Sequence, residues 1–436
     1  MKLPVENYEF PRDWKVSPVS DVADFSRGVS WGKAEEAPEG KGLLVISIPN
    51  IKDGWIDYYS KFNHYLSTEV AASKRLNLGD IVFVGSSGSI HNVGRNARVS
   101  SLPNGSVAFA SFTFKAAPKP TAIDGEFFYY LVNSDLVPFP SFCKRAADGK
   151  FNFQLRDFSS RLAIPLPPLP EQKKIAHILS TVQRAIEAQE RIIQTTTELK
   201  KALMHKLFTE GLRKEPQKRT EIGPVPESWV VVNLGDVINL FAGYAFKSDE
   251  GISESNTQLL RMGNLYQNTL DLTRSPIFYP DSFATVHRRF VLKEGDLVMS
   301  LTGTSGKEDY GFTVRIPKTD KALLLNQRVT RIDVTDPRLQ KDFAHHFLLS
   351  RKFLDYLYPT AKGMKQANLS TNAMKMLKFV LPGEAEQSEI ATYFKSLDQK
   401  VVVAGRKVAA FQDLFRTLLH ELMTAKTRVH ELELTA

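Results

Sequence analysis

The stretches LPPLPEQKKIAHILSTVQRAI (residues 166–186) and LPGEAEQSEIATYFKSLDQKV (residues 381–401) begin 215 residues apart in a chain of 436 residues. In each stretch, Leu-Pro precedes a Glu-Gln pair, an Ile-Ala pair and a long amphipathic run. When residues 166–209 are laid over residues 381–424 without a gap, 12 positions are identical. Chance would give only a few matches, so the chain contains an internal duplication.

The duplication extends to the beginning of each copy. PRDWKVSPVSDV (residues 11–22) lies over PESWVVVNLGDV (residues 226–237) at the same offset, and Gly28 lies over Gly243. With a one-residue slip, a tight turn followed by an apolar run recurs, as LGDIVFV at 78–84 and as EGDLVMS at 294–300. Each copy therefore has the same order: short strands with Gly-, Ser- and Asn-rich loops, then a Pro-rich break, then a long helix.

The two long helices are predicted to pack against each other. Apolar residues recur along both at three, four or seven positions, which is the pattern of a helix with one apolar face. The prolines before each helix end a strand and favour a helix start. About 40 residues at ~1.5 Å per residue give a rod of roughly 60 Å, too long to bury its apolar face against one compact domain. The alternative is a core helix of an ordinary domain.

We therefore predict an α+β fold with two pseudo-symmetric copies, each a mixed α/β domain followed by a long helix. The two helices are expected to pair as an antiparallel coiled coil. The predicted regions are a first head (residues 1–165), a first helical region (166–212), a linker with a second head (213–380) and a second helical region (381–436).

The composition limits the function classes. Lys and Arg number 57 against 48 Asp and Glu, a net charge of +9, which is compatible with nucleic-acid binding but does not require it. The single cysteine, Cys143, excludes an internal disulfide and a cysteine-built zinc site. The N-terminal sequence lacks the apolar stretch of a signal peptide, and no 18-residue run is typical of a membrane span. We expect a soluble protein in the reducing cytoplasm, with no membrane partner.

The loops of the two heads differ although their frames match. SSGSIHNVGRNAR (residues 86–98) and LTGTSGKEDYG (residues 301–311) have little in common. Divergent loops on a common frame are not expected of a pure scaffold. They are expected of two heads that recognise different targets. The loops carry basic and amide side chains, which contact phosphates and base edges. The candidate DNA-binding residues are Lys74, Arg75, Ser87, His91, Asn92, Arg95, Arg98, Arg145 and Lys150 in the first head, and Tyr244, Lys247, Arg261, Asn264, Lys307, Gln327, Arg328, Lys365, Gln366 and Asn368 in the second.

Motifs for catalysis are missing from the sequence. There is no Asp/Asn-Pro-Pro-Tyr/Phe tetrapeptide and no Gly-rich cofactor turn within a βαβ unit. TGTSGKE (residues 302–308) resembles a phosphate-binding loop, but Leu301 stands where the first Gly is needed and Glu308 where Ser or Thr would bind magnesium. The histidines show no metal-ligand spacing. We expect no catalytic residues and no metal site in this chain.

These features together resemble the specificity (S) subunit of Type I restriction–modification enzymes. The residues that carry the resemblance are P-x-x-W at 11–14 and 226–229, G-D-I/L-V at 79–82 and 295–298, L-P with E-Q-x-x-I-A at 166–176 and 381–391, GYAFKS at 243–248 and KQANLS at 365–370. In the first copy, WGKAEE and GKFNFQL depart from the last two patterns.

The resemblance implies a DNA-binding, non-catalytic subunit. Each head would be a target recognition domain for one half of a bipartite, asymmetric DNA site, and the helices would act as a ruler that sets the unread spacer. Two modification (methyltransferase) subunits and two restriction (translocase and nuclease) subunits would be the partners. S-adenosylmethionine, ATP and Mg²⁺ would belong to those partners, with no cofactor in this chain. The expected partner-binding residues are Glu171, Gln172, Ile175, Glu386, Gln387 and Ile390.

Two other classes remain open from the sequence. One is a stand-alone DNA methyltransferase or nuclease with an unrecognised motif. The other is a protein-binding adaptor whose heads recognise polypeptides. A DNA reader that contacts several phosphates should bind less tightly as salt rises, whereas an adaptor should not.

Overall fold

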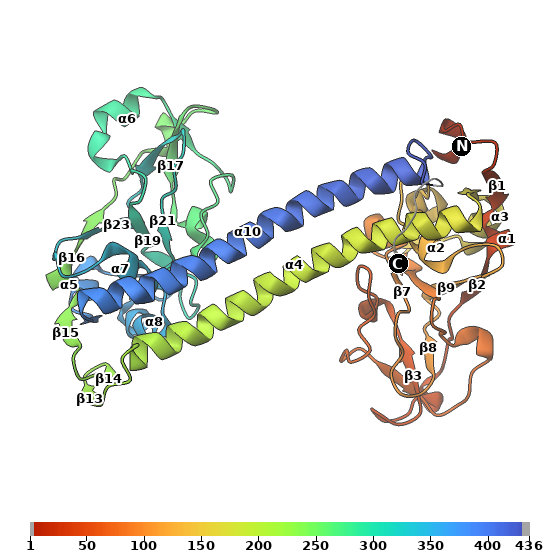
Figure 1. The fold of residues 1–436 in the computed structure, drawn as a ribbon, viewed down its shortest axis with the longest axis horizontal. Helices are drawn as coiled ribbons and strands as arrows, with labels where there is room; N and C mark the ends of the chain where they lie inside the picture. Colours follow the sequence, from red (N-terminus) through yellow and green to blue (C-terminus); the bar gives the residue numbers. More distant parts are fainter. Residues whose placement is uncertain (1–3, 430–436) are drawn as a thin grey trace. The chain divides into compact units, whose positions relative to one another are not determined.

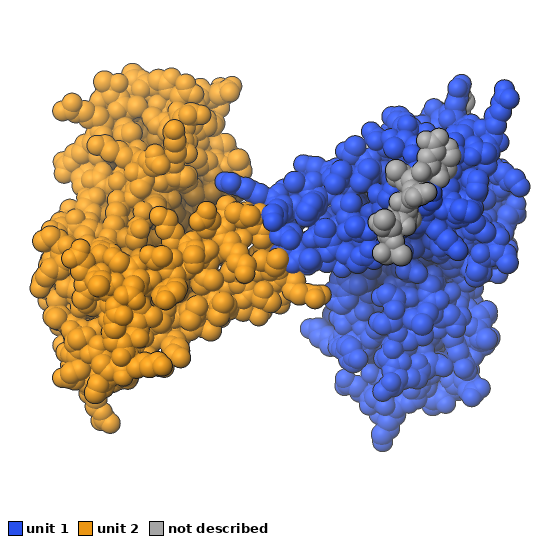
Figure 2. Space-filling view, in the orientation of Figure 1, with its two compact units in different colours: residues 1–189, 406–436 blue, residues 190–405 orange. Residues whose placement is uncertain are grey.

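The computed structural model describes residues 4–429, and the chain divides into two compact units. Unit 1 comprises residues 1–189 and 406–436, and unit 2 comprises residues 190–405 (Figure 2). Residues 1–3 and 430–436 of the predicted regions lie outside the described residues. No helix in residues 4–429 combines the length and the apolar character needed to cross a lipid bilayer.

The head of unit 1 is built on a four-stranded antiparallel sheet of order β2-β9-β5-β7. Its strands are β2 (Ala23–Arg27), β9 (Thr113–Pro118), β5 (Ile81–Val84) and β7 (Asn96–Arg98). A second sheet, β4-β3-β8, contains one parallel pair, with β4 at His64–Leu66, β3 at Leu43–Ile46 and β8 at Val107–Phe109. The remaining elements are the sheet β10-β11-β6 (Cys143–Arg145, Phe151–Phe153, Ser86–Ser87), the pair β1–β12 (Lys15–Pro18, Ala163–Leu166), and the helices α1 (Val19–Val22), α2 (Gly125–Val132) and α3 (Leu155–Arg161).

The head of unit 2 repeats this topology (Figure 1). Its main sheet has the order β16-β23-β19-β21 (Ile238–Ala242, Val329–Val334, Leu297–Ser300, Thr313–Arg315). The sheet β18-β17-β22 (Phe278–Tyr279, Thr257–Leu260, Ala322–Leu325) again contains one parallel pair. The pairs β20–β24 (Thr302–Thr304, Gln366–Asn368) and β15–β25 (Val230–Asn233, Lys378–Leu381) follow, with the helices α5 (Leu234–Val237), α6 (Ser282–Val286), α7 (Lys341–Leu348), α8 (Arg351–Leu357) and α9 (Thr371–Lys375). A hairpin, β13–β14 (Gln217–Thr220, Gly223–Pro226), has no equivalent among the described residues of unit 1.

Two long helices, α4 (Leu169–Glu210) and α10 (Glu384–Met423), contribute to both units. Both begin beside proline and carry glutamates in the first turn, where the helix dipole favours negative charge. After α4, Gly211 adopts a φ of 67°, the left-handed conformation that commonly ends a helix. The unit boundaries, after Gln189 and after Gly405, fall inside the two helices.

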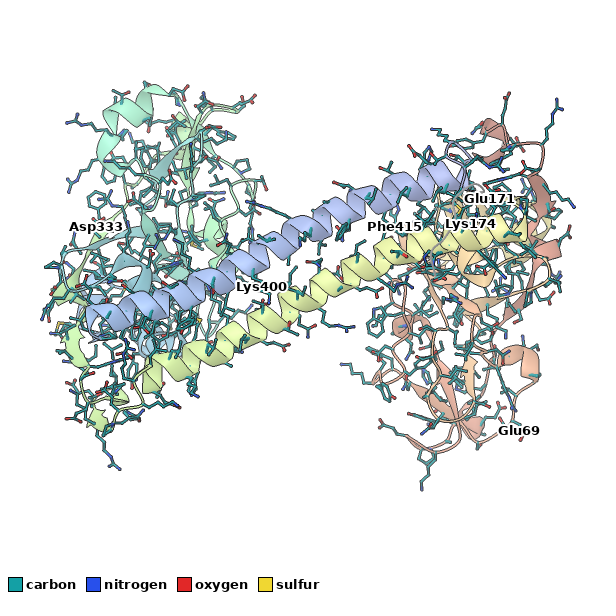
Figure 3. The ribbon with its side chains drawn as sticks, viewed as in Figure 1. Glu69, Glu171, Lys174, Asp333, Lys400 and Phe415 are labelled. Carbon is teal, nitrogen blue, oxygen red and sulfur yellow. The ribbon has the colours of Figure 1, made fainter. Side chains whose placement is uncertain are left out.

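Within each unit the start of one helix packs beside the end of the other. In unit 1, Ile175 and Leu179 of α4 share a hydrophobic core with Leu422 of α10. Phe415 of α10 packs edge-on against Tyr130 of α2, with ring centroids 5.8 Å apart (Figure 3).

The same arrangement recurs in unit 2, where Phe208 of α4 stacks on Phe394 of α10 at 5.5 Å and Lys200 pairs with Asp398. The helices therefore run antiparallel in both units. The predicted fold class, two pseudo-symmetric α+β copies with antiparallel helices, is confirmed.

The Pro-x-x-Trp and Glu-Gln motifs of each copy meet in one buried contact. Trp14 Nε1 donates to Glu171 Oε2 at 3.0 Å, and Trp229 Nε1 donates to Glu386 Oε2 at 2.9 Å. Both bonds span 157 residues, and the two glutamates are only 3% and 5% exposed. A buried carboxylate is costly unless it is hydrogen-bonded, so the indole is part of what allows this glutamate at the helix start. We call this contact the Trp–Glu brace.

The glutamine of the same motif holds a helix of the head. The main-chain N–H of Asp124, the residue before α2, donates to Gln172 Oε1 at 2.8 Å. In unit 2 the N–H of Gln340, the residue before α7, donates to Gln387 Oε1 at 2.9 Å. Each glutamine also donates to the carbonyl five residues earlier in the chain. The Glu-Gln pair thus ties two separate parts of a head to the first turn of a long helix.

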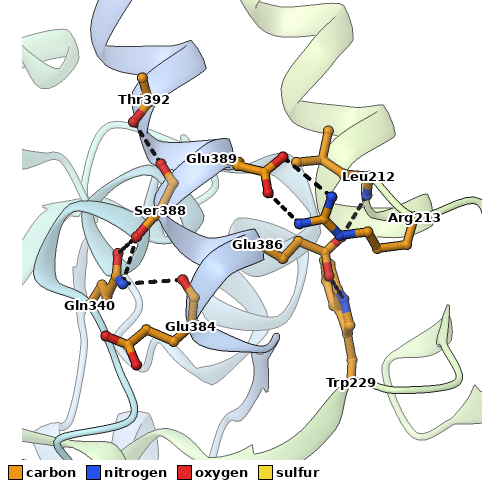
Figure 4. A network of polar contacts seen from close by, with 9 residues as sticks. All are labelled: Leu212, Arg213, Trp229, Gln340, Glu384, Glu386, Ser388, Glu389 and Thr392. Carbon is orange, nitrogen blue, oxygen red and sulfur yellow. Dashed lines mark hydrogen bonds and ion pairs between the residues drawn. The ribbon is translucent and has the colours of Figure 1, made fainter.

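The second carboxylate oxygen of each glutamate accepts a hydrogen bond from a residue that follows the end of the other long helix. In unit 2 the N–H of Leu212, just after α4, donates to Glu386 Oε1 at 2.6 Å. The neighbouring Arg213 pairs with Glu389 (Figure 4). The Trp–Glu brace of unit 2 therefore joins the head, the start of α10 and the end of α4.

In unit 1, the ion pairs around the Trp–Glu brace differ from those in unit 2. Arg428, which lies 215 residues after Arg213, donates from Nε to Glu171 Oε1 at 2.7 Å and pairs with Asp13 at 2.7 Å. The first-copy equivalent of Glu389 is Lys174, near the start of α4 (Figure 3). A lysine cannot accept from a guanidinium, and Arg428 pairs instead with Glu171, on the same helix as Lys174, and with Asp13, just before β1. The brace is the same in both units, but its outer ion pairs are not.

Gly28 and Gly243 mark a close approach of two main chains in each head. A Cβ atom at Gly28 would lie 2.1 Å from the carbonyl oxygen of Phe109, and one at Gly243 would lie 2.1 Å from that of Asn326. Since the obstacle is main chain, it cannot rotate away as a side chain could. These glycines match across the duplication because the frame requires the approach in both heads.

Replacing Gly243 by alanine is expected to lower the free energy of unfolding by about 1–3 kcal/mol, because the added methyl group would overlap the main chain at Asn326. Urea unfolding of the full chain measures this loss. The matched control is Gly405→Ala in α10, where no atom lies within 4 Å of the new Cβ and a gain of up to about 1 kcal/mol is expected. A Gly243→Ala protein as stable as the wild type would contradict the close approach.

Trp229→Phe is expected to destabilise unit 2 by about 1–3 kcal/mol, since Glu386 would stay buried without its indole donor. A double-mutant cycle with Glu386→Ala, which removes the acceptor, should give a coupling free energy of about 0.5–3 kcal/mol. The control is Trp55→Phe, at an exposed indole, with little expected change. Additive losses in the cycle would show that the two side chains do not stabilise each other.

Candidate nucleic-acid interface

The 19 candidate DNA-binding residues fall into three classes of exposure. Those on the surface are His91, Asn92, Arg145, Lys150, Tyr244, Lys247, Lys307, Gln327, Arg328, Lys365 and Asn368. The half-buried ones are Lys74, Arg75, Ser87, Arg95, Arg98, Arg261 and Gln366, and Asn264 is buried. Candidates chosen by residue type alone therefore include both exposed side chains, which a ligand can reach, and buried ones, which it cannot.

All five half-buried cations among the candidates interact with their own head. The contacts are Lys74 to Arg27 O, Arg75 to Val70 O at 3.2 Å, Arg95 to Ile48 O at 3.5 Å, Arg261 to Ser275 O, and Arg98 with Glu126 at 4.0 Å. A guanidinium that donates to loop carbonyls holds the loop in place and has fewer donors left for a ligand. These five side chains position the surface and are weaker candidates for direct contact.

Asn264 is not available to a base. Its side chain is 1% exposed, its Oδ1 accepts from Arg261 N at 2.9 Å, and its Nδ2 donates to Asp271 O at 2.8 Å. Reading adenine would require both atoms of this amide at the surface. The expectation of a base contact is therefore corrected for Asn264: it is a structural residue of a loop.

Several exposed candidates gather on one equivalent small sheet in each head. In unit 1, Arg145 lies on β10, with its guanidinium 5.9 Å from the ring centroid of Phe151, and Lys150 directly precedes β11. In unit 2, Lys365 directly precedes β24, 215 residues after Lys150. The segment GKFNFQL thus lies at the same place in its sheet as KQANLS does in unit 2, although its residues differ from the KQANLS pattern. Strand pairing fixes this position in both heads, and only the side chains differ.

The strands β20 and β24 form one wall of a groove in unit 2. The groove has a volume of about 410 Å³ and contains two candidates, Lys365 and Gln366. The other lining residues are Met262, Gly263, Tyr266, Arg274, Thr302, Gly303, Thr304, Asp309 and Phe312. A second hollow of about 290 Å³ includes Lys307 and Glu308, whose carboxylate pairs with Arg351 at 2.6 Å.

The opposite wall of the groove carries aromatic and basic groups that were not among the residues predicted from the sequence. Tyr266 is exposed, and the Arg274 guanidinium lies 4.8 Å from its ring centroid. A signal for this loop is present in both copies: IPNIKDGWID (residues 48–57) and MGNLYQNTLD (residues 262–271) share an Asn followed seven residues later by an Asp.

The six expected partner-binding residues are all buried by contacts within the chain. Glu171 and Glu386 form the Trp–Glu braces, Gln172 and Gln387 hold α2 and α7, and Ile175 and Ile390 belong to the two largest cores. A partner subunit could not reach these side chains in this fold. Their burial corrects the expectation of direct contact and assigns them to joining each head to a helix.

The titratable groups of the described residues form no metal site. No group of three or more His, Cys, Asp or Glu side chains in residues 4–429 could hold a metal ion. Burial lowers the pKa of His345 to about 4 and that of His346 to about 2, so both imidazoles are neutral near pH 7. Burial also raises the pKa of the Cys143 thiol to about 11, which keeps it protonated.

Known proteins resemble this chain over nearly its whole length. The sequence model of the Type I restriction modification DNA specificity domain matches residues 11–197 and again residues 226–406. The Type I restriction enzyme MjaVIII specificity subunit of Methanocaldococcus jannaschii is 27% identical over 429 residues, covering 97% of this chain and 95% of the relative. The EcoKI specificity subunit of Escherichia coli is 24% identical over 397 residues, 89% of this chain and 83% of the relative.

A solved structure shares the fold. The crystal structure of the S subunit of a Type I restriction–modification system from M. genitalium has a TM-score of 0.56 with 16% sequence identity, covering 97% of this chain and 98% of that one. The twofold match of the sequence model agrees with the two units and with their shared topology. The chain therefore belongs to the Type I restriction–modification DNA specificity family, that of the non-catalytic specificity subunits of these systems.

Proposed function

We propose that this chain reads a bipartite DNA sequence, one half-site with each head, and that α4 and α10 set the length of the unread spacer. The observation that carries the proposal is that both heads share strand order and brace, while the surface loops on that frame differ. The target recognition domains would be residues 1–165 and 213–380, and the spacer-setting regions residues 166–212 and 381–436.

The chemistry of the exposed candidates supports duplex DNA as the ligand. Arg145, Lys150, Lys307 and Lys365 supply donors for phosphates and for guanine edges, and Asn368 supplies an amide suited to adenine. The other exposed candidates, His91, Asn92, Tyr244, Lys247, Gln327 and Arg328, extend these surfaces. The half-buried cations hold the loops in position.

The helices offer a surface for protein partners. Several apolar side chains on α4 and α10 are exposed: Leu199, Tyr393, Val402, Val403 and Leu414. Exposed apolar residues at a partner site are covered on assembly. We assign this surface to two modification subunits, which would bring S-adenosylmethionine, with two restriction subunits that use ATP and Mg²⁺ completing a cytoplasmic complex.

Two other functions make different predictions. A stand-alone methyltransferase would transfer labelled methyl groups from S-adenosylmethionine to DNA without any partner subunit. A protein-binding adaptor would bind a polypeptide with an affinity that hardly changes with salt. DNA binding depends on salt because cations of the protein displace counterions from phosphates.

The affinity of the purified full chain for its cognate duplex is expected to fall steeply between 50 and 200 mM salt, by about 10³-fold for roughly six phosphate contacts. Fluorescence anisotropy of a labelled duplex measures this. The variant Lys150→Ala/Lys365→Ala should bind more weakly and with a shallower salt slope. Lys201→Ala/Lys206→Ala, at two exposed lysines on α4, is the matched control for loss of charge alone. Absence of duplex binding throughout this salt range would contradict the proposal and favour the adaptor.

A further inference from the structure

A buried asparagine closes the same loop in each head. Asn50 is 0% exposed and Asn264 is 1% exposed. In both, Oδ1 accepts from the main-chain N–H three residues earlier, at 2.9 Å, and Nδ2 donates to the carbonyl seven residues later, at 2.8 Å. The same atoms make the same bonds with the same spacing, so the loop frame is duplicated together with the sheets.

The middle of each loop is fixed against a strand of the main sheet. The fourth residue after the asparagine adopts a left-handed conformation, with φ of 84° at Gly54 and 59° at Asn268. Gly54 N donates to Asn96 O, on β7, at 3.1 Å. In unit 2, Asn268 Oδ1 accepts from Thr313 N, on β21, at 2.8 Å. A loop held at both ends and in the middle presents its remaining side chains in a fixed arrangement.

The side chains on this fixed loop differ between the heads. We call residues 51–56 and 265–270 the clamped tips. Their first and last residues are apolar and pack into the heads. The four residues between are Lys-Asp-Gly-Trp in the first head and Tyr-Gln-Asn-Thr in the second. Trp55 is 56% exposed and Tyr266 is 47% exposed, so each tip brings a large aromatic ring to the surface.

Tyr266 of the second clamped tip lines the groove of unit 2. Arg274 packs on the ring of Tyr266, and Phe312 contacts the same ring edge-on, with centroids 5.7 Å apart. Across the groove lie Lys365 and Gln366. The only carboxylate among the lining residues, Asp309, accepts from Thr304 N at 2.6 Å. The groove therefore combines two cations, an amide and an exposed ring, a set that suits phosphates and base edges of DNA.

We propose that the clamped tips are base-reading elements of the two heads, and that in unit 2 Tyr266 and Arg274 contact duplex DNA together with Gln366. The inference rests on the proposed function and adds to it which loops carry specificity. A fixed frame with a variable tip allows the target to change without disturbing the fold. Asn50 and Asn264 are positioning residues in this scheme, since they act only through the loops.

The transplant experiment replaces Tyr266, Gln267 and Thr269 with Lys, Asp and Trp, the residue types at these positions in the first head. It leaves Asn264, Leu265, Asn268 and Leu270 unchanged, because Asn268 holds the loop to β21. The variant is expressed with its modification subunits, and the methylated sites of the host DNA are sequenced. We expect a changed second half-site, with the first half-site and the spacer as in the wild type. A second half-site identical to that of the wild type overturns the inference.

A single substitution covers the case in which the transplant does not fold, as judged by thermal unfolding. Tyr266→Ala in the full chain is expected to weaken binding of the cognate duplex about tenfold and to leave binding of random duplex unchanged. The matched control is Tyr356→Ala, at an exposed tyrosine on α8 outside the groove. Unchanged cognate affinity for Tyr266→Ala contradicts the inference and leaves the proposed function standing. Failure of the proposed function is distinct, because the wild-type chain itself would then not bind DNA.

Discussion

The fold depends on a buried glutamate at the start of each long helix, accepting a hydrogen bond from a tryptophan 157 residues earlier. A carboxylate removed from water must find donors, and here they come from two directions, with the helix dipole adding to their effect. The indole comes from the first strand region of the head, the helix N-terminus supplies a favourable dipole, and the chain after the opposite helix supplies an N–H or a guanidinium. Because these contacts come from the head and from both long helices, the brace forms only when all three are in place.

The residues of the Trp–Glu brace and the order of the strands around it are the same in both copies, whereas many residues outside this frame differ. Gly28, Gly243 and the Glu-Gln pairs are fixed by close main-chain approach or by buried hydrogen bonds. Outside this frame the copies have diverged even in charge: Glu389 pairs with Arg213 in unit 2, whereas Lys174 stands at the equivalent place in unit 1. Loops that carry no part of the frame are free to diverge further, and these are the loops to which we assign DNA reading.

The sequence predicted the frame well and the surface less well. The repeat of Leu-Pro, Glu-Gln and Ile-Ala predicted helices at 166–212 and 381–436, and α4 and α10 lie within those limits. The resemblance to specificity subunits implied that the Glu-Gln side chains bind partners, whereas the structure buries them within the chain. Their donors lie far away in sequence, and helical periodicity carries no information about such bonds. Asn264 was mistaken for a base contact, and the clamped tips were overlooked, because residue type does not show burial; the partners of Asn264 lie only three to ten residues away in sequence.

Lengthening both helices tests most directly the claim that two separate heads share one spacer-setting pair of helices. Four residues would be inserted into α4 after Glu190 and four into α10 after Gly405, adding about one helical turn and ~6 Å, the rise of nearly two base pairs. Sequencing the methylated DNA of a host carrying this variant yields both half-sites and the spacer together. We predict unchanged half-sites and a spacer longer by about one or two base pairs, because the added ~6 Å of helix corresponds to nearly two base pairs of DNA. An unchanged spacer with an altered half-site would contradict the account.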